Sequence, residues 1–458
     1  MRILLIFPNS PITSEPCCSI YNPVKLPPYE LLLSAANLRN KFDVKVLDAK
    51  AENYSINQTE ELIRSYKPDM AVIWTTQLYH LKDIKILETA KKYKAITVLV
   101  MNEAILLKQI LERFKYIDIA VNEGDKPAVL KEVAEAVTSK KGFSKARGII
   151  YRKGNRIIDN GMIGISDFSK LPMAAYDMAP MEKYYKGYIG IFSSRGCPFK
   201  CTFCFLGNTR WSGRSAEQVV DELELLNKKY GYKHMGFIDQ LFTYSRQRVL
   251  DICSGIKKRN LKIRWICDSR VEFVDNELLK AMHDAGCRRI FYGVEHVSDE
   301  ILKNVNKNQN KEKILKTIEL TKKAGIKPAM SFIIGFPGES RKTINELMQF
   351  IIKAKPWQYA VVFPVPFPGT RLYQQAKENK WIVIEEKPEN FYVEKAMTPV
   401  MVVPPWTAKS LLRARKKLIL IPRLHPVILM NTLRDVYSRG GLAKLVGIAG
   451  SAYRIAAE

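Results

Sequence analysis

The chain has 458 residues, of which 47% are apolar and 26% are charged. These proportions are typical of a globular protein and exclude a disordered chain, and the length predicts two or three domains. No apolar run approaches the roughly 18 residues of a membrane span. The short apolar start at residues 3–7 predicts a first strand and not a signal peptide. We therefore expect a cytoplasmic protein.

The formal net charge of +27 is large. A basic surface attracts nucleic acid or anionic lipid, and it also keeps a protein in solution. Lysines are scattered over most of the predicted helices, and no compact Lys/Arg tract interleaved with aromatic residues marks a nucleic-acid site. We therefore expect no nucleic-acid partner.

Residues 1–140 alternate short apolar strands with helical segments. We expect strands at 3–7, 44–47, 70–74, 97–101 and 117–121, and helices at 29–38, 59–65, 81–93, 104–114 and 127–137. This alternation predicts an open, mostly parallel α/β sheet with helices on both faces. Ligands of such sheets bind at the carboxyl ends of the strands.

Residues 141–185 are rich in turn residues and predict a linker, with a hairpin near 148–151. The alternation resumes over 186–395, where we expect strands at 188–193, 235–239, 263–267 and 290–295, a later strand from 331, and a helix at 216–230. This pattern predicts a partial (β/α) TIM-type barrel, whose chemistry lies at the carboxyl ends of its strands. Residues 396–458 predict a basic helical tail.

The most informative motif is a C-x3-C-x2-C spacing formed by Cys197, Cys201 and Cys204. Thiolates favour iron–sulfur clusters and zinc. Structural zinc needs four closed ligands, and the nearest further candidates, His234 and Cys253, lie far downstream. Disulfides pair cysteines evenly and need an oxidising compartment. A cubane cluster needs one ligand per iron, so three ligands on one loop predict a cluster with one open iron.

This motif resembles that of the radical S-adenosylmethionine (SAM) enzymes, and Phe203 matches the aromatic residue that precedes their third cysteine. In that family three cysteines bind a [4Fe-4S] cluster and the open iron binds SAM, which is cleaved reductively to a 5′-deoxyadenosyl radical. The resemblance implies that Cys197, Cys201 and Cys204 are the catalytic cluster ligands. It also implies SAM as a cofactor and an electron donor such as ferredoxin or flavodoxin.

The resemblance extends to strand ends of the predicted barrel. It assigns Arg270 to the SAM carboxylate, Glu295 to the ribose, Gly335 to the adenine-side turn, and Asp239 to the methionyl amine or substrate. From the residues alone, an N-cap is an alternative for Asp239, and structural ion pairs are alternatives for the other charged residues. Gln240 stands where family members often have a second acidic residue.

The first 140 residues resemble the Rossmann-like (flavodoxin-like) cobalamin-binding domain of one large radical SAM class. The matching strand-end residues, which the resemblance assigns to cofactor binding, are Pro8, Thr75, Thr76, Glu123 and Gly124. Two features depart from that class: Met101-Asn102 replace the usual Gly-Gly pair, where side chains could crowd the nucleotide tail, and an Asp-x-His-x-x-Gly motif is absent. The alternative is a repurposed Rossmann-like domain without a corrinoid.

Together these resemblances imply a cobalamin-dependent radical SAM enzyme that methylates an unactivated carbon of a hydrophobic substrate, such as a lipid or isoprenoid. A radical SAM cyclase or rearranging enzyme is the alternative within the family. A non-catalytic iron–sulfur redox or lipid-surface protein is the alternative from another class. The sequence does not identify the substrate.

The C-terminal region concentrates positive charge, because residues 407–458 contain ten Lys/Arg and two acidic residues. A basic amphipathic helix can lie on an anionic membrane surface. We expect peripheral membrane contact through this tail, and packing against the barrel is the alternative.

Overall fold

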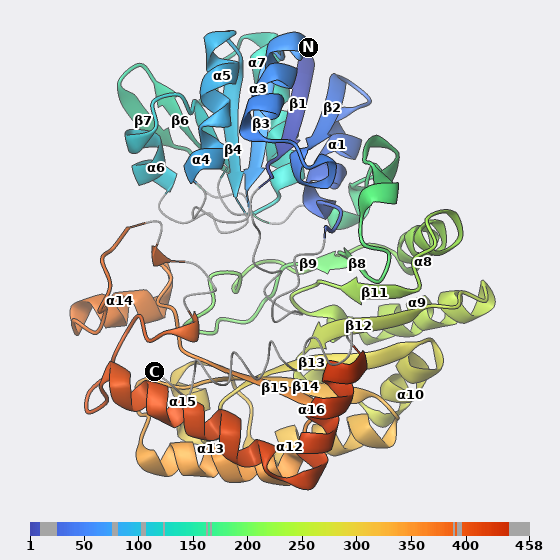
Figure 1. Cartoon of the computed structure of the whole chain (residues 1–458), viewed down its shortest axis with the longest axis vertical. Coiled ribbons are helices and arrows are strands. Elements are labelled where there is room, and N and C mark those ends of the chain that lie inside the picture. Colours follow the sequence, from blue (N-terminus) through green and yellow to red (C-terminus); the bar gives the residue numbers. More distant parts are fainter. Residues whose placement is uncertain are drawn as a thin grey trace.

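The computed structural model describes residues 1–9, 25–75, 81–101, 107–121, 124–161, 164, 167–387, 390–391 and 396–438. Figure 1 shows two α/β halves, with the carboxyl ends of the strands of the first sheet directed toward the second half. The predicted fold class is confirmed. Among the described residues, no helix is both long and apolar enough to cross a membrane.

The first sheet has the strand order β2-β1-β3-β4-β5-β6-β7. Its strands are β1 (Arg2–Phe7), β2 (Asp43–Asp48), β3 (Met70–Thr75), β4 (Ile96–Met101), β5 (Ile119–Val121), β6 (Ile149–Lys153) and β7 (Arg156–Asp159). Strands β1 to β5 are parallel. The order reverses between β1 and β3, and ligands of doubly wound sheets bind at this point.

Helices cover both faces of this sheet because alternate strand residues point to opposite sides. The helices are α1 (Tyr29–Leu38), α2 (Ala49–Glu52), α3 (Ile56–Tyr66), α4 (Leu81–Ile84), α5 (Ile86–Lys92), α6 (Leu107–Arg113) and α7 (Lys126–Ser139). Along β1, Ile3 and Leu5 join one hydrophobic core, and Leu4 and Ile6 join the other. The single helix predicted at 81–93 is two helices, α4 and α5, which meet at Lys85.

The hairpin predicted near 148–151 is present, but it belongs to the first sheet. Strand β6 pairs antiparallel with β5, with Ile119 opposite Tyr151, and β7 pairs with β6. The segment interpreted as a linker from residue 141 therefore begins as part of the first domain. The rest of that segment contains three short 3₁₀ turns, η2 (Phe168–Lys170), η3 (Tyr176–Met178) and η4 (Met181–Lys183).

The second sheet is parallel, and its spatial order β8-β11-β12-β13-β14-β15 follows the chain. Its strands are β8 (Ile189–Ile191), β11 (His234–Phe237), β12 (Arg264–Ser269), β13 (Cys287–Glu295), β14 (Lys327–Ile333) and β15 (Gln358–Val362). Its helices are α8 (Ala216–Glu224), continued by the π-helical turn η5 (Leu225–Lys229), then α9 (Arg246–Lys258), α10 (Asn276–Asp284), α11 (Asp299–Asn304), α12 (Lys311–Lys323), α13 (Arg341–Ala354) and α14 (Arg371–Glu378). This sequential order is that of a partial barrel, as predicted.

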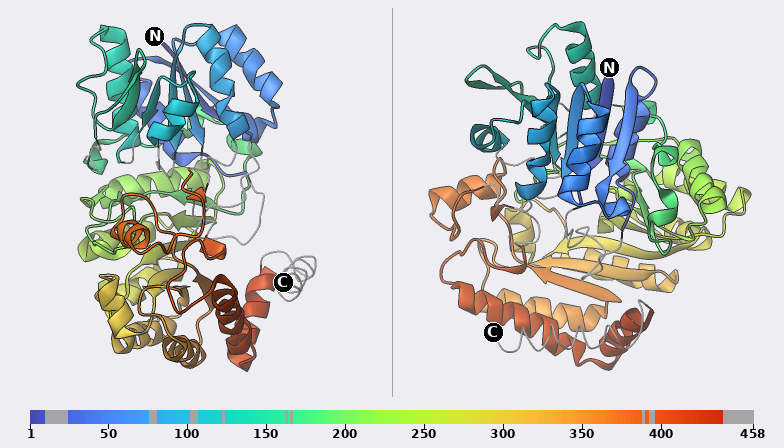
Figure 2. Two further views of the ribbon diagram at one scale, coloured as in Figure 1. Left: turned by 90° about the vertical axis from the view of Figure 1, so that its left-hand side faces the viewer. Right: turned by 45° about the horizontal axis from the view of Figure 1, so that its top comes forward.

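The C-terminal helices α15 (Ala408–Arg423) and α16 (Pro426–Ser438) pack against β15 and α13 at the edge of the barrel sheet, on the outside of the second half (Figure 2). Pro422 lies inside α15 and has no N–H to bond the carbonyl of Leu418. The hydroxyl of Tyr359, on β15, donates to that carbonyl at 3.0 Å. The tail therefore begins as a structural part of the barrel half.

Candidate functional site

The three clustered cysteines lie on a loop whose base is a two-residue ladder. After β8, strand β9 (Ser194–Arg195) pairs antiparallel with β10 (Ser212–Gly213) and encloses residues 196–211. Gly196 opens the loop with φ +85°, and a Cβ at this position would lie 2.1 Å from the carbonyl oxygen of Arg210. The motif therefore needs glycine before Cys197.

The donor set of this loop fits a cluster better than a single metal ion. Cys197, Cys201 and Cys204 are free thiols of intermediate exposure, and burial raises the pKa of Cys204 to about 11. Metal binding must then displace protons. Among the described residues, no three His, Cys, Asp or Glu side chains are arranged to hold one metal ion. In a cubane each cysteine sulfur binds a different iron. The three cysteine sulfurs therefore need not converge on one point.

The cysteine loop docks onto residues 305–306, just after α11, and onto the turn that contains Gly335. The amide of Thr202 donates to the carbonyl of Val305 at 3.0 Å, and the side-chain amide of Asn306 donates to the carbonyl of Lys200 at 2.8 Å. The ring of Phe203 lies 5.4 Å from that of Phe336, centroid to centroid. The predicted aromatic residue is thereby placed beside the turn that contains Gly335.

Arg270, which follows β12, lies against the cysteine loop. Its guanidinium is stacked 3.9 Å from the ring centroid of Phe199, and its Nη1 lies 3.7 Å from Cys201 Sγ. Its Nη2 donates to Glu272 at 2.8 Å and to the carbonyl of Lys307. Burial opposes the charge, but Glu272 and Cys201 together outweigh burial, so the pKa of Arg270 is raised. The structure therefore places a fixed cation beside the sulfur of Cys201.

Glu295 has a strained backbone at the end of β13. Its φ is +66°, and the register with β14 shifts between Gly293 and Glu295. The carboxylate accepts from Lys307 Nζ at 3.0 Å and from Ser331 Oγ at 3.3 Å. Strain of this kind is retained where a side chain must be aimed at a functional site. Sequence reasoning missed Lys307, because no local pattern distinguishes it from the other lysines.

The turn containing Gly335 is held by a buried acid that the sequence analysis did not select. Glu339 Oε2 accepts from the amide of Gly335 at 3.3 Å, and its Oε1 lies 3.4 Å from His296 Nε2. His296 Nδ1 accepts from the amide of Ser298 at 2.9 Å, so its proton lies on Nε2 and faces Glu339. This pair links the end of β13 to the Gly335 turn.

Asp239, expected to contact SAM, substrate or a helix N-terminus, is not an N-cap and has its hydrogen-bond partners below the cysteine loop. Its carboxylate accepts from the amide of Ser193 at 2.7 Å, from Ser193 Oγ at 2.5 Å and from Ser194 Oγ at 2.6 Å. Burial raises its pKa, and helix α9 begins after Ser245 instead. These hydrogen bonds of Asp239 hold the strand end below the cysteine loop. Gln240 serves the same loop, because its Oε1 accepts from the amide of Gly196 at 3.1 Å.

The residues predicted at the carboxyl edge of the first sheet are only partly described. Pro8 follows β1, and Thr75 ends β3 and is buried. Gly124, after β5, has φ +131°. Thr76 and Glu123 lie outside the described residues, as does Asn102. Met101 is buried in the core beneath the sheet edge, so its side chain does not cause the crowding that loss of the Gly-Gly pair predicted.

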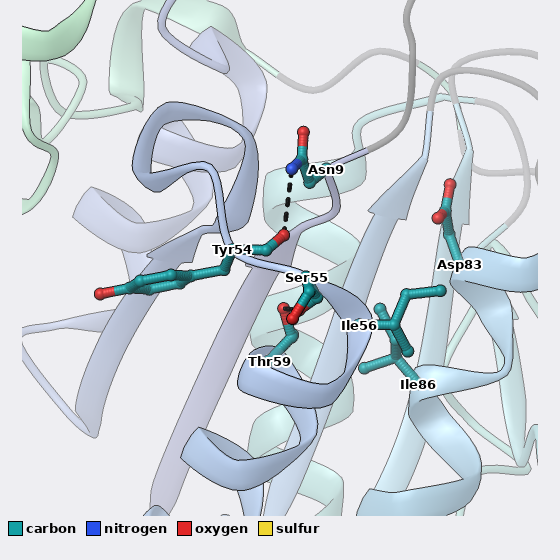
Figure 3. A pocket seen from close by; sticks show the side chains of 7 residues that line it. All are labelled: Asn9, Tyr54, Ser55, Ile56, Thr59, Asp83 and Ile86. Carbon is teal, nitrogen blue, oxygen red and sulfur yellow. Dashed lines mark hydrogen bonds between the residues drawn. The ribbon is translucent and has the colours of Figure 1, made fainter.

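A cavity of about 230 Å³ lies at the switch point of this edge (Figure 3). It is lined by Asn9, Tyr54, Ser55, Ile56, Thr59, Asp83 and Ile86. The volume is below the roughly 300–1,000 Å³ of a typical small-molecule site. This cavity alone is therefore too small to enclose a ligand of the size of a corrin.

A buried charge cluster joins the two halves directly behind the cysteine loop. Arg195 donates to Glu30 Oε1 at 2.7 Å and lies 4.0 Å from Asp125 Oδ1. Lys126 Nζ lies 3.8 Å from Glu30 Oε2. The guanidinium also lies 4.9 Å from the ring centroid of Phe168. Glu30 and Asp125 come from the carboxyl edge of the first sheet, so that edge is tied to the residue just before Gly196.

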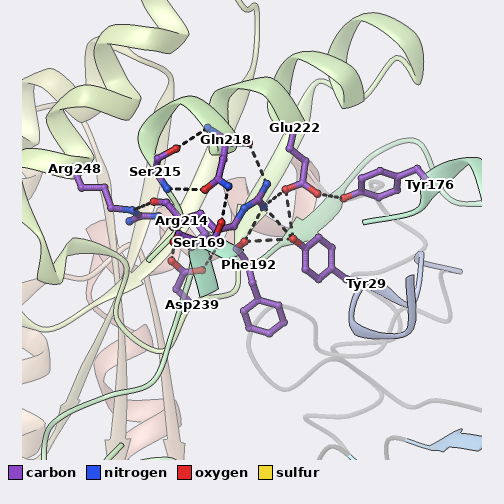
Figure 4. A network of polar contacts seen from close by, with 11 residues as sticks. Tyr29, Ser169, Tyr176, Phe192, Arg214, Ser215, Gln218, Glu222, Asp239 and Arg248 are labelled. Atoms are coloured by element: carbon purple, nitrogen blue, oxygen red, sulfur yellow. Dashed lines mark hydrogen bonds and ion pairs between the residues drawn. The ribbon is translucent and has the colours of Figure 1, made fainter. Parts of the chain in front are cut away.

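A second network of hydrogen bonds extends this contact between the two halves (Figure 4). Tyr29, the first residue of α1, accepts from Arg214 Nη1 at 3.2 Å, and Arg214 pairs with the buried Glu222. Tyr176 donates to Glu222 Oε1 at 2.8 Å. Arg248 donates to the carbonyl of Ser193 at 2.6 Å. The first domain, the connecting segment and the strand below the cysteine loop thus share one set of hydrogen bonds.

Comparison with known proteins agrees with this geometry. Residues 191–351 match the model of the radical SAM superfamily. The chain is 28% identical over 451 residues to an uncharacterized methyltransferase of Pyrococcus horikoshii, PH0819, and the match covers 96% of both chains. It is 26% identical to an anaerobic magnesium-protoporphyrin IX monomethyl ester cyclase of Rubrivivax gelatinosus, over 88% of this chain and 73% of that one.

A solved structure has the same arrangement of domains. It is that of the radical SAM methyltransferase TsrM from Kitasatospora setae with cobalamin and a [4Fe-4S] cluster bound. Its TM-score is 0.68 at 18% identity, covering 83% of this chain and 78% of that chain. At this identity the likeness establishes the fold, which includes both the Rossmann-like sheet and the barrel.

Proposed function

The chain belongs to the radical SAM superfamily of enzymes, and from this premise we propose that it is a cobalamin-dependent methyltransferase acting on an unactivated carbon of a hydrophobic substrate. The observation that supports the proposal is that the carboxyl edge of the first sheet faces the carboxyl edge of the barrel sheet. The cysteine loop lies on one edge, and Arg195 ties it to Glu30 on the other. A cofactor on the first sheet would then stand opposite a cluster on the barrel.

On the barrel side, Cys197, Cys201 and Cys204 would hold the [4Fe-4S] cluster and leave one iron to SAM. When bound, this pair of cofactors supplies a carbon-centred radical. Arg270, beside Cys201 Sγ, would stabilise negative charge on the cluster. Glu295, fixed by Lys307 and Ser331, would accept hydrogen bonds from the ribose. The turn that contains Gly335 would offer main chain to the adenine.

On the first-domain side, Pro8, Thr75 and Gly124 lie at the carboxyl ends of β1, β3 and β5. We assign this edge to a corrin ring, because ligands of doubly wound sheets bind at the carboxyl ends of the strands. When bound there, cobalamin supplies a transferable methyl group. The similarity to a cobalamin-bound methyltransferase fold supports this assignment.

The first experiment is anaerobic reconstitution with iron, sulfide, SAM and hydroxocobalamin. We expect corrin absorbance to remain with the protein through gel filtration, and 5′-deoxyadenosine to form after reduction. Protein that cleaves SAM but retains no corrin would refute the cobalamin part of the proposal alone. Iron-loaded protein that never cleaves SAM would favour a non-catalytic redox role.

A ring-forming reaction is the second candidate, because the similarity to the Rubrivivax cyclase extends over most of both chains. SAM labelled in its methyl group separates the two reactions in assays with candidate hydrophobic substrates. Methyl transfer gives a product that carries the label. Ring formation gives an unlabelled product that has lost hydrogen.

A further inference from the structure

An apolar surface remains exposed on the two C-terminal helices. Among the described residues fourteen large apolar side chains are exposed, and eight of them fall between residues 412 and 433. Six of them lie on the last turn of α15, in the connection between the helices or on α16, and are here called the corner patch: Leu420, Ile421, Leu424, Val427, Met430 and Leu433. Leu424, at the turn itself, is 78% exposed.

The corner patch is not the face by which these helices hold the barrel. In α15 that face consists of Leu411, Ala414 and Leu418, which are buried. It is also fixed by Arg415, whose Nε donates to the carbonyl of Val361 at 2.8 Å. Among the described residues, none covers the corner patch, and its side chains stay exposed while the opposite side of α15 packs on the barrel.

The charges around the corner patch are of one sign. Lys409, Arg413 and Lys417 recur every four residues along the exposed side of α15, and Arg434 is exposed on α16. Asp435 is the one acidic residue between 396 and 438. It lies inward, 3.5 Å from Trp357 Nε1 and 4.0 Å from Arg289 Nη1. An apolar centre with cations on both flanks matches the boundary between acyl chains and anionic headgroups.

We propose that the corner patch docks on the surface of an anionic phospholipid bilayer, with Leu424 and its apolar neighbours entering the headgroup boundary and the flanking cations facing lipid phosphates. The contact is peripheral. The helix that would contact lipid at its end, α15, also contacts the turn that contains Gly335 at its start. There, Leu411 Cδ1 lies 3.4 Å from the position of a Cβ on Gly335. The inference stands apart from the proposed chemistry, because it concerns binding alone.

The test is cosedimentation of the full chain with vesicles of phosphatidylcholine and phosphatidylglycerol, and with vesicles of phosphatidylcholine alone. We expect a clear preference for the anionic vesicles. The double variant L424E/M430E should lower the partition coefficient about tenfold or more. It replaces two apolar side chains that would enter the bilayer by carboxylates, which anionic headgroups repel. The double variant R413E/K417E should lower it about tenfold on anionic vesicles and little on neutral ones.

Two matched controls carry the same changes elsewhere. Val383 is also an exposed apolar residue, and V383E should bind like the parent chain. Lys257 and Lys258 are exposed at the end of α9, and K257E/K258E tests whether net charge alone drives binding. Far-UV circular dichroism checks that each variant is folded.

Three results would overturn the proposal. One is equal loss of binding in the corner variants and in the controls. Another is binding that survives L424E/M430E but disappears when residues 439–458 are removed, which would assign the contact to the tail. The third is a dimer, detected by light scattering, that L424E/M430E converts to a monomer, which would make a second copy the occupant.

Discussion

The carboxyl edges of the two sheets differ in the chemical groups that they present to a ligand. The barrel edge carries charged and thiol side chains, such as Cys201, Arg270 and Glu295, aimed at one region and held by further side chains. At the first edge the buried acids are used within the fold instead: Asp48 and Asp125 accept from amides at the start of α2 and α7. Among the described residues, this edge offers a ligand the strand ends and a small cavity.

This difference suggests a division of labour. An edge made of side chains can hold a cluster and orient a polar cofactor, and single substitutions should damage it in specific ways. An edge made of main chain recognises shape, so most of its side chains should be replaceable. Substitutions at each edge, and at the ion pair between them, test this contrast.

The largest effect is expected at the barrel edge from Cys201→Ala. Loss of one thiolate should reduce iron content after anaerobic reconstitution to background and abolish formation of 5′-deoxyadenosine. Cys253→Ala is the matched control, because Cys253 is buried in α9 away from the loop. Colorimetric iron assay and product analysis measure both. A Cys201→Ala protein that still carries a full cluster would contradict the ligand assignment.

The second effect tests the connection between the edges. Arg195→Ala breaks a buried pair with Glu30, and removal of one partner from such a pair costs about 3–5 kcal/mol. Arg39 and Asp177 also join α1 to the connecting segment, but this pair is exposed. Arg39→Ala should therefore cost at most about 1 kcal/mol. Urea unfolding of the two variants compares these values, and equal destabilisation would mean that Arg195 does not couple the edges.

The third prediction separates two carboxylates of the barrel edge. Glu295→Gln should leave iron content unchanged and weaken SAM binding by about 1.5–3 kcal/mol, the value of a hydrogen bond to a charged group. Asp239→Asn disturbs the bonds to Ser193 and Ser194 below the cysteine loop. It should reduce iron retention and thermal stability together. Calorimetry with SAM and an iron assay distinguish the two, and parallel losses in Glu295→Gln would make that residue structural.

The sequence predicted best what is local in the chain. The cysteine spacing lies within eight residues, and strand periodicity predicted β1 to β5 of the first sheet and β8 and β11 to β14 of the second. The roles of Lys307 and Glu339 depend on side chains that meet only after folding, as do the hydrogen bonds of Asp239 to Ser193 and Ser194. Membership of the β6–β7 hairpin in the first sheet likewise depends on pairing with β5, which no local pattern reports.

The smallest effect is expected at the main-chain edge and comes from a glycine. Gly124→Ala forces a side chain onto a backbone with φ +131°, which costs about 1–3 kcal/mol of strain. Gly142 also has positive φ, +70°, and a Cβ there would meet nothing within 4 Å. Gly142→Ala therefore imposes comparable backbone strain away from the sheet edge. If main chain forms the corrinoid surface, only Gly124→Ala should reduce retention of hydroxocobalamin, measured by absorbance after gel filtration. Equal retention in both variants would show that the first edge does not bind the cofactor through its backbone.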